Sequence, residues 1–186
     1  MKIVAEGGLS TFSMKKVTQL VGVSEALIYR HFETKDKLLY ICFETVHKQI
    51  AALFKTVPPQ VPRTEQELRL WIYNMWMTYF SFLVQNDYRT IFYFEYRDSP
   101  YIHDVRKSDK EVKETYFESF VKMYNAYEQA FQIRSKVSEE HLWTYILDTS
   151  GIFAKRIIRG ELPNTKESYD IIWRLISGGI LGLFQE

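Results

Sequence analysis

The chain has 186 residues, of which 46% are hydrophobic and 25% are charged, and its formal net charge is +1. This composition excludes an intrinsically disordered chain, and the length suffices for one or two compact domains. Because the charge is close to zero, binding to nucleic acid would need a local cluster of basic side chains. The single cysteine, Cys42, excludes an internal disulfide framework and favours a reducing compartment such as the cytoplasm.

No segment has the pattern of a membrane or targeting sequence. The N-terminus lacks a signal-peptide core, because Glu6 interrupts its short apolar run. The longest uncharged run, Leu70 to Asn86, contains polar side chains and is shorter than the roughly 20 apolar residues that a spanning helix needs. We therefore expect a cytoplasmic protein that has no contact with a membrane.

Helix-start and helix-stop signals follow one another along the chain and predict an all-α protein. Thr64 and Ser108 each precede a glutamate by three residues in the capping-box pattern, and Asn164 with Glu167 is a variant of it. The run Ile91 to Tyr96 has strand-favouring residues but no hairpin partner, so we interpret it as a buried helix. In the second part of the chain we expect helices over 64–85, 88–97, 109–133, 138–159 and 165–184.

The clearest boundary is a proline-rich segment. Three prolines between Val57 and Pro62 cannot continue a helix. We expect a small N-terminal domain over residues 1–56, which includes a connecting helix, and a larger helical domain over 57–186.

Residues 13–32 have the pattern of a helix-turn-helix. Ser13 can cap a first helix, Gly22 turns the chain, and Ser24 can cap a second short helix. In that second helix Ile28 and Phe32 are four residues apart and face inward. Such a motif can place its second helix in the major groove of DNA.

A third helix begins directly after the motif. Thr34 can cap it, and Lys35 stands at its N-terminus. A lysine beside a free helix N-terminus is a suitable partner for a phosphate group.

The segment Phe12 to Ser24, followed by Leu27 to Phe32 and by Thr34-Lys35, resembles the TetR-type (tetracycline-repressor-like) transcription regulators. The resemblance covers roughly residues 3–45. It implies an all-α homodimer that binds a palindromic double-stranded DNA operator through its N-terminal helix-turn-helix heads. It also implies a small-molecule effector, bound in the larger domain, that changes the spacing of the heads.

The resemblance assigns roles to individual positions of the motif. It implies phosphate contacts for Ser13, Tyr29, His31 and Lys35, and base-edge contacts for Lys15, Glu25, Leu27 and Arg30. We add Ser24, the cap of the second helix, to these DNA-binding residues.

Two departures from the family pattern bear on these roles. Leu27 cannot hydrogen-bond to a base and could touch only a thymine methyl group or the sugar. The first helix of the family usually has three to four turns, and only Lys2 to Glu6 represent it here, so we expect roughly ten further residues before Met1.

Plainer interpretations compete with some of these roles. Tyr29 could pack against Lys35 rather than contact a phosphate. Glu25 could interact with the helix dipole rather than read a cytosine. His31 has no suitably spaced second ligand, so we do not expect it to bind a metal ion.

The larger domain is unusually rich in aromatic side chains. Any one of them can be ordinary core, but Trp and Tyr also carry polar groups that need partners when buried, and such residues often enclose an apolar pocket. We therefore expect a ligand pocket lined by Trp76, Tyr79, Phe80, Phe92, Tyr96, Tyr116, Phe120 and Trp143.

The last two expected helices combine apolar periodicity with glycines, which cost helix stability unless backbones approach closely. A domain core with incidental glycines is one interpretation. We favour a self-complementary four-helix interface between two copies of the chain, which the resemblance also implies. Its residues would be Tyr145, Thr149, Ile152, Phe153, Ile172, Leu175, Ile176, Gly179 and Leu183.

The sequence contains no catalytic motif that we can identify, so we do not expect an enzyme, a cofactor or a metal ion. We interpret the chain as a dimeric, ligand-responsive transcription regulator, a repressor that a mostly apolar small molecule releases from its operator. The alternative is a helical carrier of hydrophobic small molecules with a vestigial DNA-binding head. Salt dependence separates the two, because only a regulator that neutralises phosphates loses affinity steeply as salt rises.

Overall fold

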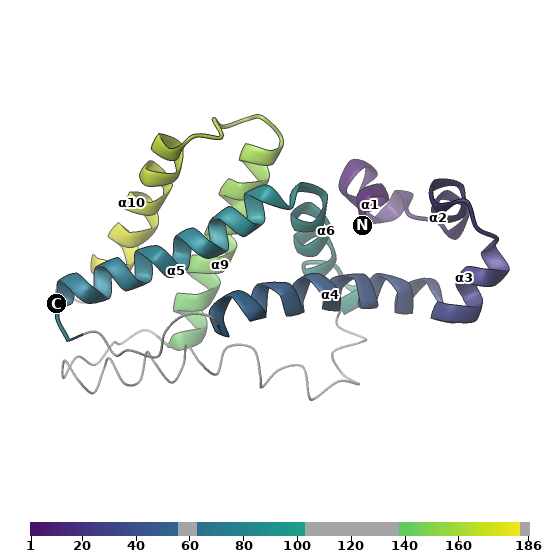
Figure 1. Ribbon diagram of the computed structural model, residues 1–186, viewed down its shortest axis with the longest axis horizontal. Helices are drawn as coiled ribbons and strands as arrows, with labels where there is room; N and C mark the ends of the chain where they lie inside the picture. Colours follow the sequence, from purple (N-terminus) through teal and green to yellow (C-terminus); the bar gives the residue numbers. More distant parts are fainter. Residues whose placement is uncertain (56–62, 103–137, 183–186) are drawn as a thin grey trace. The chain divides into compact units, whose positions relative to one another are not determined.

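The structure is a computed structural model that describes residues 1–55, 63–102 and 138–182. Every regular element in these residues is a helix, which confirms the predicted all-α class (Figure 1). The chain forms two compact units. In the described residues the first unit comprises 1–50 and 86–102, and the second comprises 51–55, 63–85 and 138–182. The helix expected over 109–133 lies outside the described residues.

The first unit begins with short helices. They are α1 (Lys2–Gly7), the 3-10 turn η1 (Leu9–Thr11), α2 (Met14–Val21) and α3 (Glu25–Phe32). The long helix α4 (Lys35–Lys55) follows, and its residues up to Ile50 belong to this unit together with α6 (Asp87–Arg97). Within the unit α1 packs against α6, and α2 packs against α3.

The three predicted caps of the N-terminal motif are present. The Ser13 hydroxyl accepts from the N–H of Lys16 at 3.3 Å, and the Ser24 hydroxyl accepts from the N–H of Leu27 at 3.3 Å. The Thr34 hydroxyl does the same for α4, accepting from the N–H of Lys37 at 3.0 Å. Each cap satisfies a backbone donor that the helix itself leaves free, so each helix starts where its cap stands.

An aromatic stack holds α4 and α6 together in the first unit. The Phe43 ring stacks on Tyr93, with centroids 5.0 Å apart and planes 4° from parallel. Phe43 also lies 5.4 Å from the Tyr96 ring, which stacks in turn on Phe92 at 5.8 Å. The residues from Ile91 to Tyr96 lie within α6, so the prediction of a buried helix rather than a strand is confirmed.

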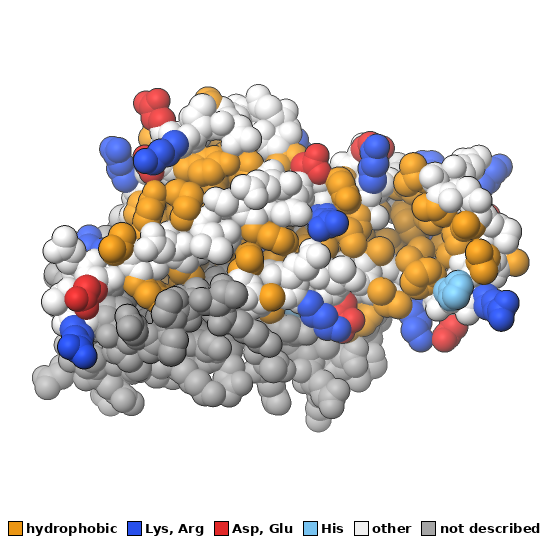
Figure 2. Space-filling model, in the orientation of Figure 1, with side chains coloured by type: hydrophobic (Ala, Val, Ile, Leu, Met, Phe, Trp, Pro, Cys, Tyr) orange, Lys and Arg blue, Asp and Glu red, His pale blue; other side chains and the backbone are white. Residues whose placement is uncertain are grey.

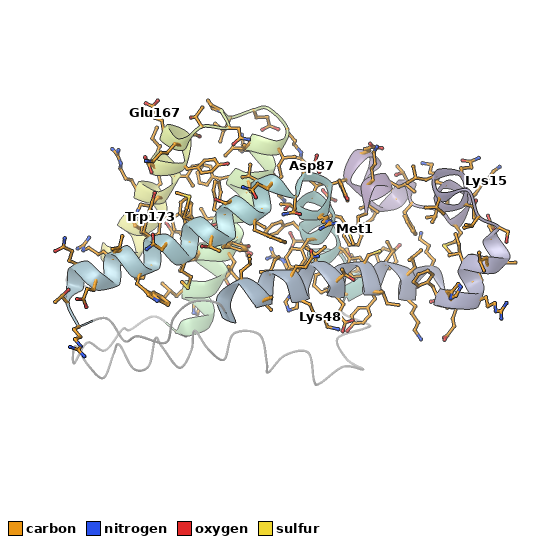
Figure 3. The ribbon with its side chains drawn as sticks, in the orientation of Figure 1. Met1, Lys15, Lys48, Asp87, Glu167 and Trp173 are labelled. Carbon is orange, nitrogen blue, oxygen red and sulfur yellow. The ribbon has the colours of Figure 1, made fainter. Side chains whose placement is uncertain are left out.

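The second unit contains α5 (Glu65–Gln85), α9 (Glu139–Ile158) and α10 (Lys166–Gly182). α5 and α10 each pack against α9. α5 also contacts α10 through aromatic rings, since the ring centroids of Trp76 on α5 and Trp173 on α10 are 5.3 Å apart and Trp173 points toward α5 in Figure 3. The Trp76 Nε1–H also donates to the Ser150 hydroxyl of α9 at 3.0 Å. A buried indole N–H that has a partner fixes how its helix faces the neighbour.

Two of the predicted helix starts in this unit are confirmed and one is shifted. The Thr64 hydroxyl caps α5 by accepting from the Glu67 N–H at 3.1 Å, although the Glu67 carboxylate accepts from the N–H of Arg63 instead of closing the box. Ser138 caps α9. The cap of α10 is Thr165, not Asn164, since the N–H of Ser168 donates to the Thr165 hydroxyl at 3.2 Å.

None of the described helices is long and apolar enough to cross a membrane.

Candidate nucleic-acid interface

The outer face of α3 is the centre of the candidate interface. Ile28 is 5% exposed and anchors the helix to the rest of the unit. Successive residues of a helix are about 100° apart, so Ala26 and Arg30 lie opposite Ile28, with Leu27 and Tyr29 on the flanks. All four are exposed, Leu27 at 41% and Tyr29 at 42%. This face presents a guanidinium, a phenol and two apolar side chains to solvent.

The turn before α3 sets the angle between the two helices of the motif. Gly22 ends α2 with φ 71° and ψ 28°, the left-handed conformation that costs glycine nothing. Its N–H closes α2 by donating to the Thr18 carbonyl at 2.8 Å. Ser24 then starts α3 in an extended conformation. The structure thus confirms the predicted helix, glycine turn and second helix.

Charge on the first unit is distributed unevenly. Lys2 pairs with Glu6 at 3.8 Å, and Lys37 pairs with Glu33 at 3.2 Å. In the part of the chain that the structure describes, the exposed cations Lys15, Lys16 and Arg30 have no ion-pair partner. Lys15 extends outward from α2 (Figure 3), and Figure 2 shows an apolar area over α2 and α3 with basic and acidic side chains at its edge. Part of the unpaired positive charge of the unit therefore lies on its helix-turn-helix.

Lys35 occupies the first position of α4, where the free backbone N–H groups of a helix attract anions. Its ammonium lies 5.5 Å from the centroid of the buried Phe12 ring. This contact accounts for the partial burial of Lys35 and holds its charge beside the start of α4.

Three further residues predicted to bind DNA are accessible in this unit. Glu25 begins α3, His31 lies exposed in the last turn of α3, and Ser13 is half-buried at the start of α2. The oxygen of Ser13 already accepts from a backbone N–H, which leaves its hydroxyl hydrogen for another acceptor.

Two parts of this surface were not among the predicted DNA-binding residues. Ala26 lies beside Arg30 on the outer face of α3, as the helical period measured from Ile28 indicates. A groove also lies between α2 and the two elements that precede it, α1 and η1. It is lined by Ile3, Glu6, Gly7, Thr11, Lys16, Gln19 and Leu20.

The residues of the expected ligand pocket come from both compact units. Trp76, Tyr79 and Phe80 are buried in the second unit, where Trp76 and Phe80 stack at 4.8 Å. Phe92 and Tyr96 are buried in the first unit. Tyr116 and Phe120 lie outside the described residues, and the side chain of Trp143 is not among those described.

Two aromatic residues of α10 were missed as partners of the second-unit cluster. Tyr169 lies edge-on to Phe80 at 5.0 Å, and Trp173 contacts Trp76 and Tyr73. Their helical positions alone did not distinguish them from solvent-facing residues. In the described residues two polar atoms of the aromatic side chains are buried without a partner, Nε1 of Trp71 and the hydroxyl of Tyr96.

Some of the expected interface residues of α9 and α10 are exposed, and others are buried. Tyr145, Ile152 and Leu175 are exposed, at 40%, 53% and 58%. Ile172 and Ile176 are instead buried within the single chain. Thr149 and Phe153 are partly exposed, Gly179 is exposed, and Leu183 lies outside the described residues. The periodic apolar stripe of α10 thus serves the interior of its own unit as well as an exposed surface.

A contact within the chain leaves no room for a side chain at Gly179. A Cβ atom there would meet the Tyr145 hydroxyl oxygen at 2.5 Å. The absence of a side chain lets Tyr145 lie against α10, where its hydroxyl donates to the Leu175 carbonyl at 3.4 Å.

No group of three His, Cys, Asp or Glu side chains in the described residues is placed to hold a metal ion. Cys42 is partly buried, and this burial raises the pKa of its thiol. A raised pKa lowers the thiolate fraction, so the site favours an unreactive thiol over a nucleophile.

Comparison with known proteins agrees with the helix-turn-helix. The family model described as "Bacterial regulatory proteins, tetR family" matches residues 1–40. No curated protein matches the sequence.

Two solved structures share the fold. A TetR family transcription regulator from Marinobacter aquaeolei aligns with a TM-score of 0.68 and 20% identity, over 93% of this chain and 86% of that one. A TetR-family transcriptional regulator from Haemophilus influenzae Rd aligns with a TM-score of 0.66 and 20% identity, over 94% and 87%. The chain thus shares the fold of these regulators, and its first 40 residues match the N-terminal model of their family.

Proposed function

We propose that the protein is a dimeric, ligand-responsive repressor that binds a palindromic DNA operator through α3. The observation that carries this proposal is the outer face of α3, where Arg30 lies exposed opposite the buried Ile28 and Leu27 and Tyr29 are exposed on its flanks. A capped, eight-residue helix that presents such a face fits the major groove, and the unpaired lysines of α2 supply charge for phosphates.

The second unit offers a surface for dimerisation. Tyr145 and Ile152 of α9 and Leu175 of α10 are large apolar side chains that lie exposed on neighbouring helices. Exposed apolar patches of this kind mark protein–protein contacts, and a two-fold axis through this pair of helices would form a four-helix interface. Two heads would then bind half-sites about one helical turn, roughly 34–36 Å, apart.

The effector would be a mostly apolar small molecule bound among aromatic side chains of the larger domain. The buried cluster of Trp76, Phe80 and Trp173 supplies apolar walls, and the unpartnered Nε1–H of Trp71 supplies a donor on the same helix as Trp76. Pockets of this composition bind small molecules by apolar contact and use a few polar groups for orientation. A coupling of about 1–3 kcal/mol between the two sites would lower operator affinity about 5–150-fold.

The test is selection of duplexes from a random library by the purified full chain at about 150 mM salt, where non-specific phosphate binding is weak. Enrichment of a palindrome supports the proposal. Planar apolar compounds are then screened for release of the labelled duplex. A folded chain that enriches no duplex contradicts the proposal and favours the hydrophobic carrier.

A further inference from the structure

Leu27 is the least expected side chain on the outer face of α3. A leucine has no hydrogen-bond donor or acceptor, so it can read no polar atom of a base. Yet 41% of its surface is exposed, while Ile28, the next residue, anchors the helix. Leu27 is not one of the buried core residues of the described unit.

Its position places it where base edges are read. Leu27 is the third residue of α3, and its backbone N–H donates to the Ser24 cap at 3.3 Å. The cap fixes the first turn of the helix, and the N-terminal residues of a recognition helix are the ones that contact base edges. Arg30, one turn later, lies close to the same side of the helix.

Among the base edges, the chemistry of the groove then leaves one target. In the major groove the only apolar group that a base pair presents is the C5 methyl of thymine. A leucine that packs on this methyl removes apolar surface from water on both partners, whereas a leucine over a polar base edge would leave the acceptors or donors of that edge unpaired.

We propose that Leu27 is a specificity residue that reads a thymine in each operator half-site through the C5 methyl group. This inference rests on the proposed DNA-binding function. It predicts that the methyl group itself, rather than any hydrogen-bonding atom of thymine, determines the preference at that position. The thymine lies next to the bases that Arg30 contacts.

The test uses the duplex selected from the random library and replaces its thymines, one symmetric pair at a time, by deoxyuridine. This change removes only the methyl group. At one pair the affinity of the parent chain should fall about fourfold for each half-site, since a buried carbon group contributes about 0.8 kcal/mol. 5-Bromodeoxyuridine, whose bromine fills the space of the methyl, should restore binding.

Three variants complete the experiment as a double-mutant cycle. Leu27→Ala should bind the thymine and uracil duplexes equally, and Leu27→Gln, which keeps the length of the side chain, should do the same. Leu20→Ala is the matched control, because Leu20 is 59% exposed on α2 and lines the groove beside α1 and η1 rather than belonging to α3. It should keep the full response to the methyl group.

The outcomes separate this inference from the function on which it rests. If no thymine pair is sensitive, or if Leu27→Ala and Leu27→Gln stay as sensitive as the parent, the inference is overturned while the selected duplex still supports a DNA-binding regulator. If no duplex is enriched at all, the proposed function fails and the reading role of Leu27 fails with it.

Discussion

The Nδ1 atom of His47 lies 2.9 Å from the hydroxyl oxygen of Tyr93, and this hydrogen bond joins α4 to α6 inside the first unit. The two rings are also nearly parallel, 15° apart, and both stack on Phe43. Because α4 begins directly after the recognition helix, its attachment to α6 contributes to holding α3 in place.

We expect Tyr93→Phe to lower the free energy of unfolding by about 1 kcal/mol, since it removes one partner of a partly buried hydrogen bond. For a chain of this length the melting temperature should fall by about 2–4 °C. Thermal unfolding followed by circular dichroism measures this. Tyr88→Phe is the control on the same helix, because Tyr88 is 40% exposed. Equal effects of the two variants would contradict the prediction.

Tyr96 should make the protein sensitive to alkali. Burial, with smaller contributions from Asp36 and Cys42, raises its pKa from 10.0 to about 12. The unfolded chain therefore loses this proton at a lower pH than the folded chain does. The ionisation of Tyr96 leaves the free energy of unfolding unchanged below pH 10 and lowers it progressively as the pH rises toward 12.

Tyr96→Phe should reduce that alkaline loss and, at pH 7, raise the free energy of unfolding by about 1 kcal/mol, because the hydroxyl is buried without a partner in the described residues. Urea unfolding at pH 7, 10 and 11.5 on the parent, Tyr96→Phe and the exposed-site control Tyr101→Phe measures both effects. A parent and a Tyr96→Phe variant with the same pH dependence would show that Tyr96 is not the group responsible.

Substitutions of Lys35 and Arg30 should weaken DNA binding in different ways. Lys35→Ala should weaken binding to every duplex and reduce the slope of log affinity against log salt by about 1 for each bound head. Arg30→Ala should cost about 1–3 kcal/mol on the selected duplex and relax the preference at one base pair of each half-site.

Fluorescence anisotropy at several salt concentrations separates these effects. Lys48→Ala serves as the control, since Lys48 pairs with Glu44 at 3.0 Å on α4, away from the outer face of α3. If Lys35→Ala changes the salt slope no more than Lys48→Ala does, Lys35 does not contact a phosphate.

The dimer proposal predicts that Leu175→Glu gives a monomer at micromolar concentration. Leu175 is 58% exposed, so a carboxylate there is solvated in the single chain but would be buried without a partner in the dimer. Leu70→Glu, at a leucine that is 60% exposed on α5, should leave the association unchanged. Sedimentation velocity distinguishes the two. A parent chain that is itself monomeric would overturn the proposal.

Local features of the first unit could be predicted from the sequence because neighbouring residues determine them. Ser13, Ser24 and Thr34 each stand next to the helix that they cap, and Gly22 provides the positive φ that the turn needs. The cap of α10 was predicted one residue early, because both Asn164 and Thr165 can serve as caps. Here the Asn164 side chain accepts from the Tyr169 hydroxyl at 2.7 Å instead.

Contacts between distant segments could not be predicted in the same way. Periodicity identified the apolar stripe of α10, but it could not say that Ile176 turns inward while Leu175 stays exposed. Aromatic density suggested one pocket, and its expected residues Phe80 and Phe92 belong to different compact units, so the pocket stays a prediction. Such choices depend on which helices pack together, which a helical period does not encode.

A hydroxyl-radical footprint of the full chain on its selected duplex tests directly whether paired α3 helices bind an operator. Such binding should give two protected regions related by the palindrome, with major-groove centres about one helical turn, 10–10.5 base pairs, apart. Both should disappear together when Leu175→Glu separates the two chains. A single protected region, or protection that does not depend on the duplex sequence, would contradict the claim that paired α3 helices read an operator.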